Sequence, residues 1–304
     1  MTQLVDGRYE LIEVIGSGGM ATVWRARDIK LERMVALKRP HPVPVGDPRH
    51  DRLAREAQLS ASINHPHLVT VHDAGSDAEG LYLVMELVNA PSLADAKGRL
   101  GREQIIEVGA QIGRALAAVH RAGVVHRDVK PGNILLAGGG AKLTDFGIAT
   151  NGGGFGTHQP TTPGYFLTTA NYAAPEVLAG QQATSKSDIF SLGVVLYELL
   201  TGRLPFNGAD RSHRPMPVDD PVGPIIDRCL SPYPGERPDG EELAGLLTSA
   251  PARPVARRAV AAAAAAYDPT ATTVMAPMPS TTGSSTIVRP PTTTMTDPRA
   301  VARD

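Results

Sequence analysis

Cysteine is almost absent from this chain, because among its 304 residues only Cys229 occurs. A single cysteine excludes an internal disulfide framework, which fits a reducing cytoplasm. No apolar run approaches the roughly 18 to 20 residues that a membrane-spanning helix needs, and the alanine run at 259–266 is far too short. The first nine residues are polar and include Asp6, so we expect no secretion signal. These absences predict a cytoplasmic protein without a membrane span.

Excess charge is also lacking, since 30 basic and 31 acidic residues leave a formal charge of −1 at pH 7. This balance does not support binding to nucleic acid or general attraction to a membrane. Lysine is scarce and occurs only at positions 30, 38, 97, 130, 142 and 186. Where arginine is the usual cation, a lysine at a chemically demanding position is informative, and Lys38 and Lys130 occupy such positions.

The residues that are present divide the chain into a β-rich part, a helical part and a tail. Strands are expected at five segments of the β-rich part, 9–15, 21–27, 34–39, 68–73 and 81–87, and at 141–144 in the later part. Helical spacing and stop signals predict helices at four: about 49–63, 104–121, 188–201 and about 240–247. After Ser249 the composition changes to Ala, Pro, Thr, Ser and Arg, so we expect a disordered tail at 249–304.

The segment from His126 to Asn133 groups a carboxylate, a cation and an amide in one short loop. This grouping suits a reaction in which a hydroxyl attacks a metal-bound phosphate. Asp128 could orient and deprotonate the hydroxyl, Lys130 could neutralise charge that develops on the phosphate, and Asn133 could bind Mg²⁺. Taken alone, a charged loop with a Pro-Gly turn is also typical of an ordinary solvated loop.

A glycine-rich turn at 16–19 lies between the first two expected strands. Its backbone could lie close over phosphates, although a plain hairpin turn has the same composition. A dinucleotide-binding turn would have to open a helix, whereas Thr22, Val23 and Trp24 suit a strand. The sequence therefore favours a β-hairpin flap.

Three further charged residues suit the binding of a nucleotide. Lys38 ends a short strand and could contact the α- and β-phosphates, oriented by Glu56 of the following helix. Asp145 also ends a strand, and with Asn133 it could hold Mg²⁺ against the phosphates. The ordinary alternatives are an exposed lysine, a solvated glutamate and a turn aspartate. Their occurrence together, in this order, favours the functional interpretation.

Together these motifs resemble the protein kinase family, and specifically the eukaryotic-like serine/threonine kinases of bacteria. The resemblance implies an α+β, two-lobed kinase domain at 9–248, after an extension at 1–8. A small β-rich N-lobe would occupy 9–88 and a larger helical C-lobe 89–248, with ATP in the cleft between them. It also implies an enzyme that transfers the γ-phosphoryl group of ATP to Ser or Thr hydroxyls of proteins, with Mg²⁺, or alternatively Mn²⁺.

The resemblance gives each motif a role. Lys38 and Glu56 would form the activating ion pair, Asp128 would be the catalytic base, and Asn133 and Asp145 would bind the metal. Residues from the flap, the strands and the hinge would surround ATP, with Met85 at the back of the adenine pocket: Ile15, Gly16, Ser17, Gly18, Gly19, Val23, Ala36, Lys38, Met85, Glu86, Val88 and Leu135.

Other matches concern specificity and control. Lys130 with Thr169 indicates Ser/Thr specificity, because Thr169 matches the threonine that bonds the catalytic Asp and Lys in such enzymes. Arg127 implies control by phosphorylation, since a cation beside the base awaits an anion such as phosphothreonine. Thr161 and Thr162 are the preferred autophosphorylation sites, and an unmodified loop is the alternative. Phosphorylated tail threonines could also dock phosphothreonine-binding modules.

Ala174-Pro175-Glu176 resembles the motif that closes the activation segment, with Arg237 as its usual ion-pair partner. Asp188 resembles a buried helix aspartate that hydrogen-bonds the catalytic loop, although the helix dipole also favours an acid there. The stretch from Phe206 to Pro224 is short and Pro-rich. A helix that normally docks substrates is therefore expected to be reduced or absent.

Two other functions fit the same fold. A pseudokinase would have lost Lys38, Asp128, Asn133 or Asp145, and all four are present. A small-molecule phosphotransferase shares the catalytic Asp and the metal ligands, but it generally lacks a segment that closes in Ala-Pro-Glu. The motif at 174–176 therefore favours a protein substrate.

Overall fold

The computed structural model describes seven stretches of the chain: 3–17, 21–41, 61–145, 170–207, 210–211, 215 and 217–252. All of them belong to one compact unit, residues 1–253. The expected helix at about 49–63 lies almost wholly outside the described residues, as do the flap tip and the tail from 253 onward. The domain boundaries drawn from the sequence stay predictions.

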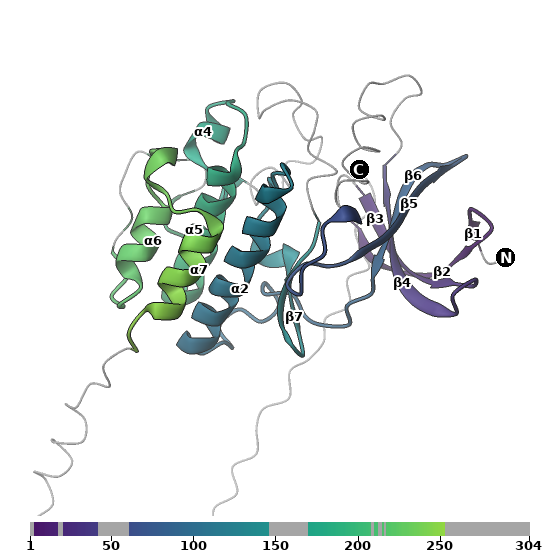
Figure 1. Ribbon diagram of the computed structural model, residues 1–304, viewed down its shortest axis with the longest axis horizontal. Helices are drawn as coiled ribbons and strands as arrows, with labels where there is room; N and C mark the ends of the chain where they lie inside the picture. The colour runs from purple at the N-terminus through teal and green to yellow at the C-terminus, as the bar shows by residue number, and fades with distance from the viewer. Residues whose placement is uncertain are drawn as a thin grey trace, which may run out of the picture. The chain divides into compact units, whose positions relative to one another are not determined.

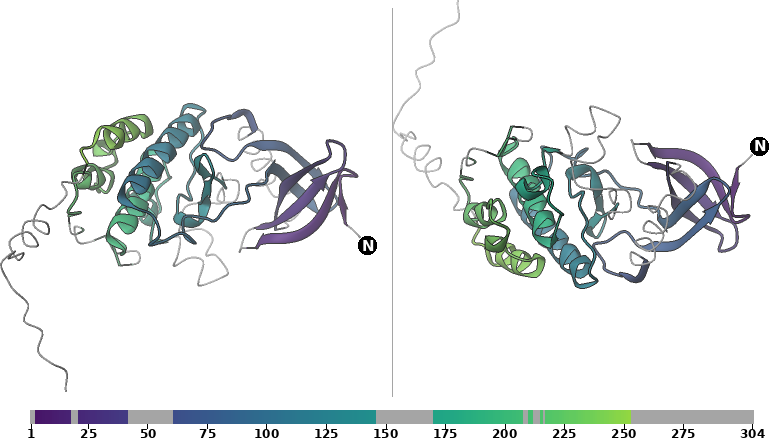
Figure 2. Two further views of the ribbon diagram at one scale, coloured as in Figure 1. Left: turned by 90° about the horizontal axis from the view of Figure 1, so that it is seen from below. Right: turned by 90° about the horizontal axis from the view of Figure 1, so that it is seen from above.

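A six-stranded antiparallel sheet forms the N-terminal part and curls strongly (Figures 1 and 2). Its order is β1-β2-β3-β4-β6-β5. The strands are β1 (Leu4–Val5), β2 (Tyr9–Ser17), β3 (Ala21–Asp28), β4 (Arg33–Pro40), β5 (Val71–Asp77) and β6 (Gly80–Glu86). All five strands expected in the β-rich part are thus present, and β1 is an addition.

The start of β5 differs from the expectation, because the strand begins at Val71 and not at Leu68. Leu68 instead forms an isolated parallel bridge with Leu143, and Val69 N donates to Leu143 O at 2.9 Å. Leu68 and Val69, just before β5, therefore connect the sheet to the C-terminal part.

The side chains of β4 point alternately to the two faces of the sheet. Val35 and Leu37 point into the apolar core of the sheet, whereas Ala36 packs in a different cluster, with Met85. Because side chains alternate along a strand, Lys38 shares the face of Ala36. The period of two therefore buries the aliphatic residues on one side and presents the lysine on the other.

The C-terminal part is mainly helical (Figure 1). Its elements are α2 (Arg102–Arg121), the 3₁₀ turn η1 (Pro131–Asn133), β7 (Ile134–Ala137), β8 (Gly140–Leu143), α4 (Pro175–Leu178), α5 (Ser185–Thr201), α6 (Gly223–Cys229), the 3₁₀ turn η2 (Pro234–Glu236) and α7 (Gly240–Ser249). The three helices expected here match α2, α5 and α7, and the strand expected at 141–144 matches β8. The sequence did not predict β7, α4 or α6. The described residues of 206–222 contain no helix, and α6 begins at Gly223, so the expected reduction of the stretch from Phe206 to Pro224 stays a prediction.

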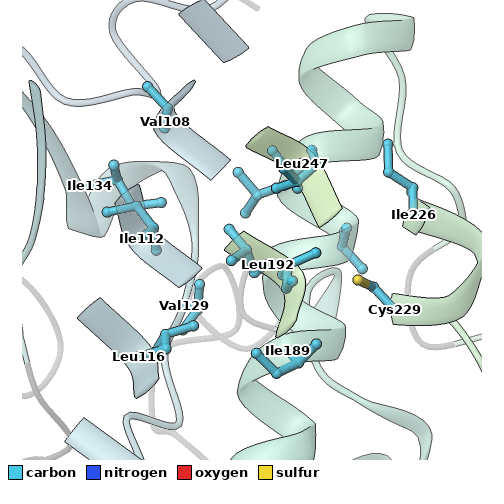
Figure 3. Close-up of a cluster of buried hydrophobic side chains, with 14 of the residues drawn as sticks. Val108, Ile112, Leu116, Val129, Ile134, Ile189, Leu192, Ile226, Cys229 and Leu247 are labelled. Carbon is cyan, nitrogen blue, oxygen red and sulfur yellow. The ribbon is translucent and has the colours of Figure 1, made fainter. Parts of the chain in front are cut away.

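Helix α5 lies at the centre of this part, as its apolar composition indicates. Leu192 is fully buried and lies with Ile112 and Leu116 of α2 in one continuous core (Figure 3). Val129 of the catalytic loop joins the same core. The loop with the catalytic candidates is thus anchored by an apolar side chain in its own sequence.

Gly193, in the middle of α5, lies against Cys229 of α6. A methyl group at position 193 would lie 2.6 Å from Cys229 Cβ, far inside van der Waals contact. We therefore expect Gly193→Ala to lower the free energy of unfolding by about 1 to 3 kcal/mol, although alanine favours helices more than glycine does. Urea denaturation measures the change.

Gly245→Ala provides the matched control for this substitution. Gly245 is an exposed glycine of α7, and no atom lies within 4 Å of an added methyl group there. Alanine at 245 should leave the protein as stable or up to about 1 kcal/mol more stable. Equal effects of the two substitutions would contradict the close packing of α5 on α6.

Candidate active site

An ion pair joins the sheet to the segment after β8. Lys38 Nζ lies 2.7 Å from Asp145 Oδ1, and the two side chains are 10% and 32% exposed. Asp145 has a φ of +65°, a left-handed conformation that is costly for a residue other than glycine and is concentrated at functional sites. Glu56, the expected partner of Lys38, lies outside the described residues.

A small pocket adjoins this ion pair. Val69, Val71, Leu83, Met85 and Thr144 line it together with Lys38 and Asp145. Next to it, Ala36, Val69 and Met85 form a buried cluster against which Val23, Val88 and Leu135 pack. Residues expected to surround an adenine ring thus come together from β3, β4, β6 and β7.

Glu86 ends β6 with both its backbone and its side chain engaged. Its N–H donates to Thr70 O at 2.9 Å, and its carboxylate accepts from Lys142 Nζ at 2.8 Å. Burial raises the pKa of Glu86, but the hydrogen bonds from Lys142 and the Thr70 N–H and the positive charge of Lys142 together outweigh burial, so the pKa is lowered. The backbone N–H of Glu86 is therefore already engaged within the sheet.

The other residues expected around ATP divide into two groups. Ile15, Gly16 and Ser17 end β2, where Gly16 pairs with Val23 and Ile15 is exposed. Gly18 and Gly19 of the flap lie outside the described residues. The predicted phosphorylation sites Thr161 and Thr162 and the predicted specificity residue Thr169 also lie outside them.

The loop at 126–133 carries a compact polar cluster around one carboxylate. Asp128 Oδ2 accepts hydrogen bonds from Lys130 Nζ at 2.8 Å and from Asn133 Nδ2 at 2.9 Å. Asn133 Nδ2 also lies 2.8 Å from the carbonyl oxygen of Asp128. Asp128, Lys130 and Asn133, grouped from sequence alone, are thus in mutual contact.

Asp188 of α5 hydrogen-bonds the backbone of the loop at 126–133, as the sequence indicated. Its carboxylate is 1% exposed and accepts from the backbone N–H groups of His126 and Arg127, both at 2.8 Å. His120 Nε2, 2.7 Å from Asp188 Oδ2, is a third partner that the sequence did not indicate. Nothing in the spacing of His120 distinguishes it from a solvated residue near a helix end.

The loop is also tied to the segment that carries Asp145. His126 Nε2 lies 2.9 Å from Thr144 O, and Thr144 N donates to Asn133 O at 2.9 Å. Asn133 and Asp145 are thereby fixed on adjoining segments. His126 itself is fully buried, so its ring serves to hold the two segments together.

Asn133 and Asp145 form a donor set that suits a hard divalent cation. Asn133 engages Asp128 through its amide nitrogen, which leaves its amide oxygen as the atom that can bind a metal. Asp145 engages Lys38 through Oδ1, and its carboxylate has a second oxygen. Mg²⁺ is commonly held by one or two such oxygen ligands, with phosphate and water completing its shell.

The predicted ion pair between Glu176 and Arg237 forms in full. Arg237 Nη1 and Nη2 lie 2.7 and 2.9 Å from the two carboxylate oxygens of Glu176. Arg237 also donates to Ser231 O and Lys186 O. Burial raises the pKa of Glu176, but the hydrogen bonds from Arg237 and Ser187 outweigh burial and lower the pKa.

Arg237→Met should therefore destabilise the fold strongly. The Arg237 side chain is fully buried and that of Glu176 is 8% exposed, so the substitution leaves a buried carboxylate without its cation. We expect the free energy of unfolding to fall by about 3 to 5 kcal/mol, measured by urea denaturation at neutral pH.

Arg228→Met is the matched control for that measurement. It breaks an ion pair of similar length, 2.9 Å to Glu242, in which both side chains are nearly half exposed. Exposed pairs contribute about 0 to 1 kcal/mol, so this variant should unfold almost like the wild type. A small effect at Arg237 would show that Glu176 does not depend on its partner.

A two-lobed arrangement with this site defines a protein kinase domain, and comparison with known proteins agrees. The model of the protein kinase domain family matches residues 9–243. The chain belongs to this family.

The chain is similar to the serine/threonine-protein kinase PknA of Mycobacterium tuberculosis, with 44% identity over 214 residues. That match covers 67% of this chain and 49% of PknA, and the chain spans half or less of the length of the first curated relatives that it matches.

Two solved structures share the fold. The PknI kinase domain of M. tuberculosis has a TM-score of 0.65 and 25% identity, with 82% of this chain and 97% of that chain covered. Rad53 in complex with AMP-PNP has a TM-score of 0.63 and 28% identity, covering 78% and 64%. Within the part that the structure describes, no helix is long and apolar enough to cross a membrane.

Proposed function

We propose that this chain is a protein kinase that transfers the γ-phosphoryl group of ATP to serine and threonine hydroxyls of proteins. One observation carries the proposal: the Asp128 carboxylate accepts hydrogen bonds from Lys130 and Asn133. The loop that holds these residues is bonded through His126 to Thr144, and the next residue, Asp145, is paired with Lys38 of β4. A base, a cation for phosphate and two metal ligands then converge. The names of the curated relatives support Ser/Thr specificity.

Asp128 is the group that handles the proton. Its carboxylate orients the acceptor hydroxyl and takes its proton as the new oxygen–phosphorus bond forms. The bond from the γ-phosphorus to the bridging oxygen breaks, and its electron pair leaves with ADP. Lys130, 2.8 Å from Asp128, is close enough to neutralise the charge on the transferred group.

Lys38 binds the α- and β-phosphates in this proposal, and the wall of Ala36, Met85 and Leu135 receives the adenine. Asn133 and Asp145 would hold Mg²⁺, which would neutralise negative charge on the phosphates when bound. The AMP-PNP bound by Rad53 supports ATP as the nucleotide.

Regulation and partners complete the proposal. Arg127 precedes the base, and we infer that phosphorylation of Thr161 or Thr162 by the kinase itself supplies the anion that Arg127 binds. We also infer that phosphorylated tail threonines dock phosphothreonine-binding modules. The kinase acts in cytoplasmic signalling in this proposal. Thr161→Ala with Thr162→Ala tests the first inference, because unchanged activity and phosphate incorporation would contradict it.

The identity of the phosphorylated residues tests the proposed function. The full chain is incubated with γ-labelled ATP, Mg²⁺ and myelin basic protein, and phosphoamino acids are then separated. Phosphoserine and phosphothreonine are the expected products. Phosphotyrosine would contradict the specificity, and absence of transfer would favour a pseudokinase.

A further inference from the structure

A guanidinium outside the catalytic loop contacts the turn that leads into α4. Arg211 Nη2 donates hydrogen bonds to the carbonyl oxygens of Ala170 at 2.9 Å, Asn171 at 3.1 Å and Ala173 at 2.9 Å. Ala170 and Ala173 are buried. One guanidinium nitrogen, whose two N–H groups are shared among three acceptors, therefore contacts three of the four carbonyl oxygens of the turn 170–173.

Arg211 is itself fixed by aromatic rings. Its Cζ lies 4.4 Å from the centroid of Phe206, a distance at which a cation is attracted to a ring face. Phe206 stacks on Phe190 of α5, with centroids 5.8 Å apart and an interplanar angle of 15°. Burial lowers the pKa of Arg211 to about 10, so the guanidinium stays protonated at neutral pH.

Two arginines that lie on the stacked rings of Phe190 and Phe206 contact the chain before α5. Arg237 Cζ lies 4.9 Å from the Phe190 ring, and Arg237 holds Glu176 of α4. Arg211 holds the turn immediately before α4. The ion pair of Arg237 with Glu176 was expected from the sequence, whereas the contacts of Arg211 were not.

The position of Arg211 in the chain indicates why the turn needs it. Arg211 lies in the short stretch between Phe206 and Pro224, where a substrate-docking helix was expected to be reduced. The described residues of 206–222 contain no helix. The turn 170–173 is thus supported from this side by an arginine and a stacked phenylalanine.

We propose that Arg211 is a positioning residue for the protein substrate. It holds the turn 170–173 in the conformation that receives the polypeptide around the acceptor hydroxyl. This inference rests on the proposed function. Because Arg211 acts through the turn and is not among the residues that line the nucleotide site, its loss should weaken binding of the protein substrate more than binding of ATP.

The chemistry of this contact requires an arginine. A planar guanidinium can donate several hydrogen bonds while one face lies on an aromatic ring, whereas a lysine ammonium is a compact charge with no plane to stack. Methionine retains much of the apolar volume but donates nothing. Arg211→Lys and Arg211→Met therefore form a graded pair.

The test compares Michaelis constants of the full-length chain for two substrates, myelin basic protein and ATP. Arg211→Met should raise KM for myelin basic protein by roughly tenfold, as expected for the loss of hydrogen bonds from a charged donor. Arg211→Lys should give a smaller increase. KM for ATP should change by less than about twofold in both. Arg203→Gln, which removes an exposed arginine just after α5, is the matched control and should behave like the wild type.

The outcomes separate this inference from the proposed function. If the wild type transfers no phosphate, the proposed function fails and this inference fails with it. If the wild type is active and neither Arg211 variant changes KM for the protein substrate, only the inference is overturned. A lower melting temperature with unchanged KM would indicate a structural role alone and also overturns it. Should Arg211→Met fail to fold, the result for Arg211→Lys decides.

Discussion

Replacing Asp128 with asparagine should slow phosphoryl transfer by about a thousandfold, within the range that general acid–base catalysis contributes. The amide cannot take the proton of the acceptor hydroxyl, although its oxygen can still accept from Lys130 or Asn133, which both contact the carboxylate now. The loop should keep its place, because Asp188 and His126 anchor it through separate contacts. Initial rates at saturating ATP measure the loss.

Two controls make this result specific to the proton-accepting group. Glu103→Gln removes the same charge from a side chain that is 79% exposed at the start of α2, and it should leave the rate unchanged. KM for ATP should stay within about twofold in Asp128→Asn. A variant that retained a tenth or more of the wild-type rate would show that another group accepts the proton.

Asp145→Asn should abolish most of the stabilisation that ATP and Mg²⁺ together give to the fold. The substitution weakens a metal ligand and also removes the anion that lies 2.7 Å from Lys38. We expect the dissociation constant for ATP with Mg²⁺ to rise about a hundredfold. That is a loss of roughly 2.7 kcal/mol, which a thermal-shift titration can measure.

Removing the metal separates the two effects of this substitution. With EDTA in place of Mg²⁺, any difference in ATP affinity between wild type and Asp145→Asn reports only the lost anion beside Lys38, and we expect it to be much smaller than the difference measured with Mg²⁺. Asn133→Ala removes the other proposed ligand without touching Lys38 and should also lose affinity only when Mg²⁺ is present. Affinities that differ equally with and without Mg²⁺ would contradict a metal role for Asp145.

The spacing of apolar residues predicted the strands and helices that have a clear local pattern. It did not predict features that depend on contacts with distant parts of the chain. The alternating strands around β4 and the apolar stripe of α2 appear as expected. Strand β5 begins later, because Leu68 and Val69 bond with Leu143, a contact 74 or more residues away that no local pattern encodes. Helix α6 was missed because its seven residues are too few to show a helical period.

The candidate site was predictable where a motif fixes its residues within one loop. Asp128, Lys130 and Asn133 are within five positions and meet in the structure. Contacts between residues of separate elements were harder to predict from the sequence. The pairing of Lys38 with Asp145 spans 107 positions, and Arg211 contacts the turn before α4 from a stretch whose described residues form no helix or strand.

Transfer of phosphate by the wild type and by Asp128→Asn, measured side by side, is the most direct test of the central claim. Both proteins receive γ-labelled ATP, Mg²⁺ and myelin basic protein, and labelled phosphoserine and phosphothreonine are quantified over time. We predict steady incorporation with the wild type and about a thousandth of that rate with Asp128→Asn. No transfer by the wild type, or equal transfer by both proteins, would contradict the assignment of this chain as a kinase that uses Asp128 as its base.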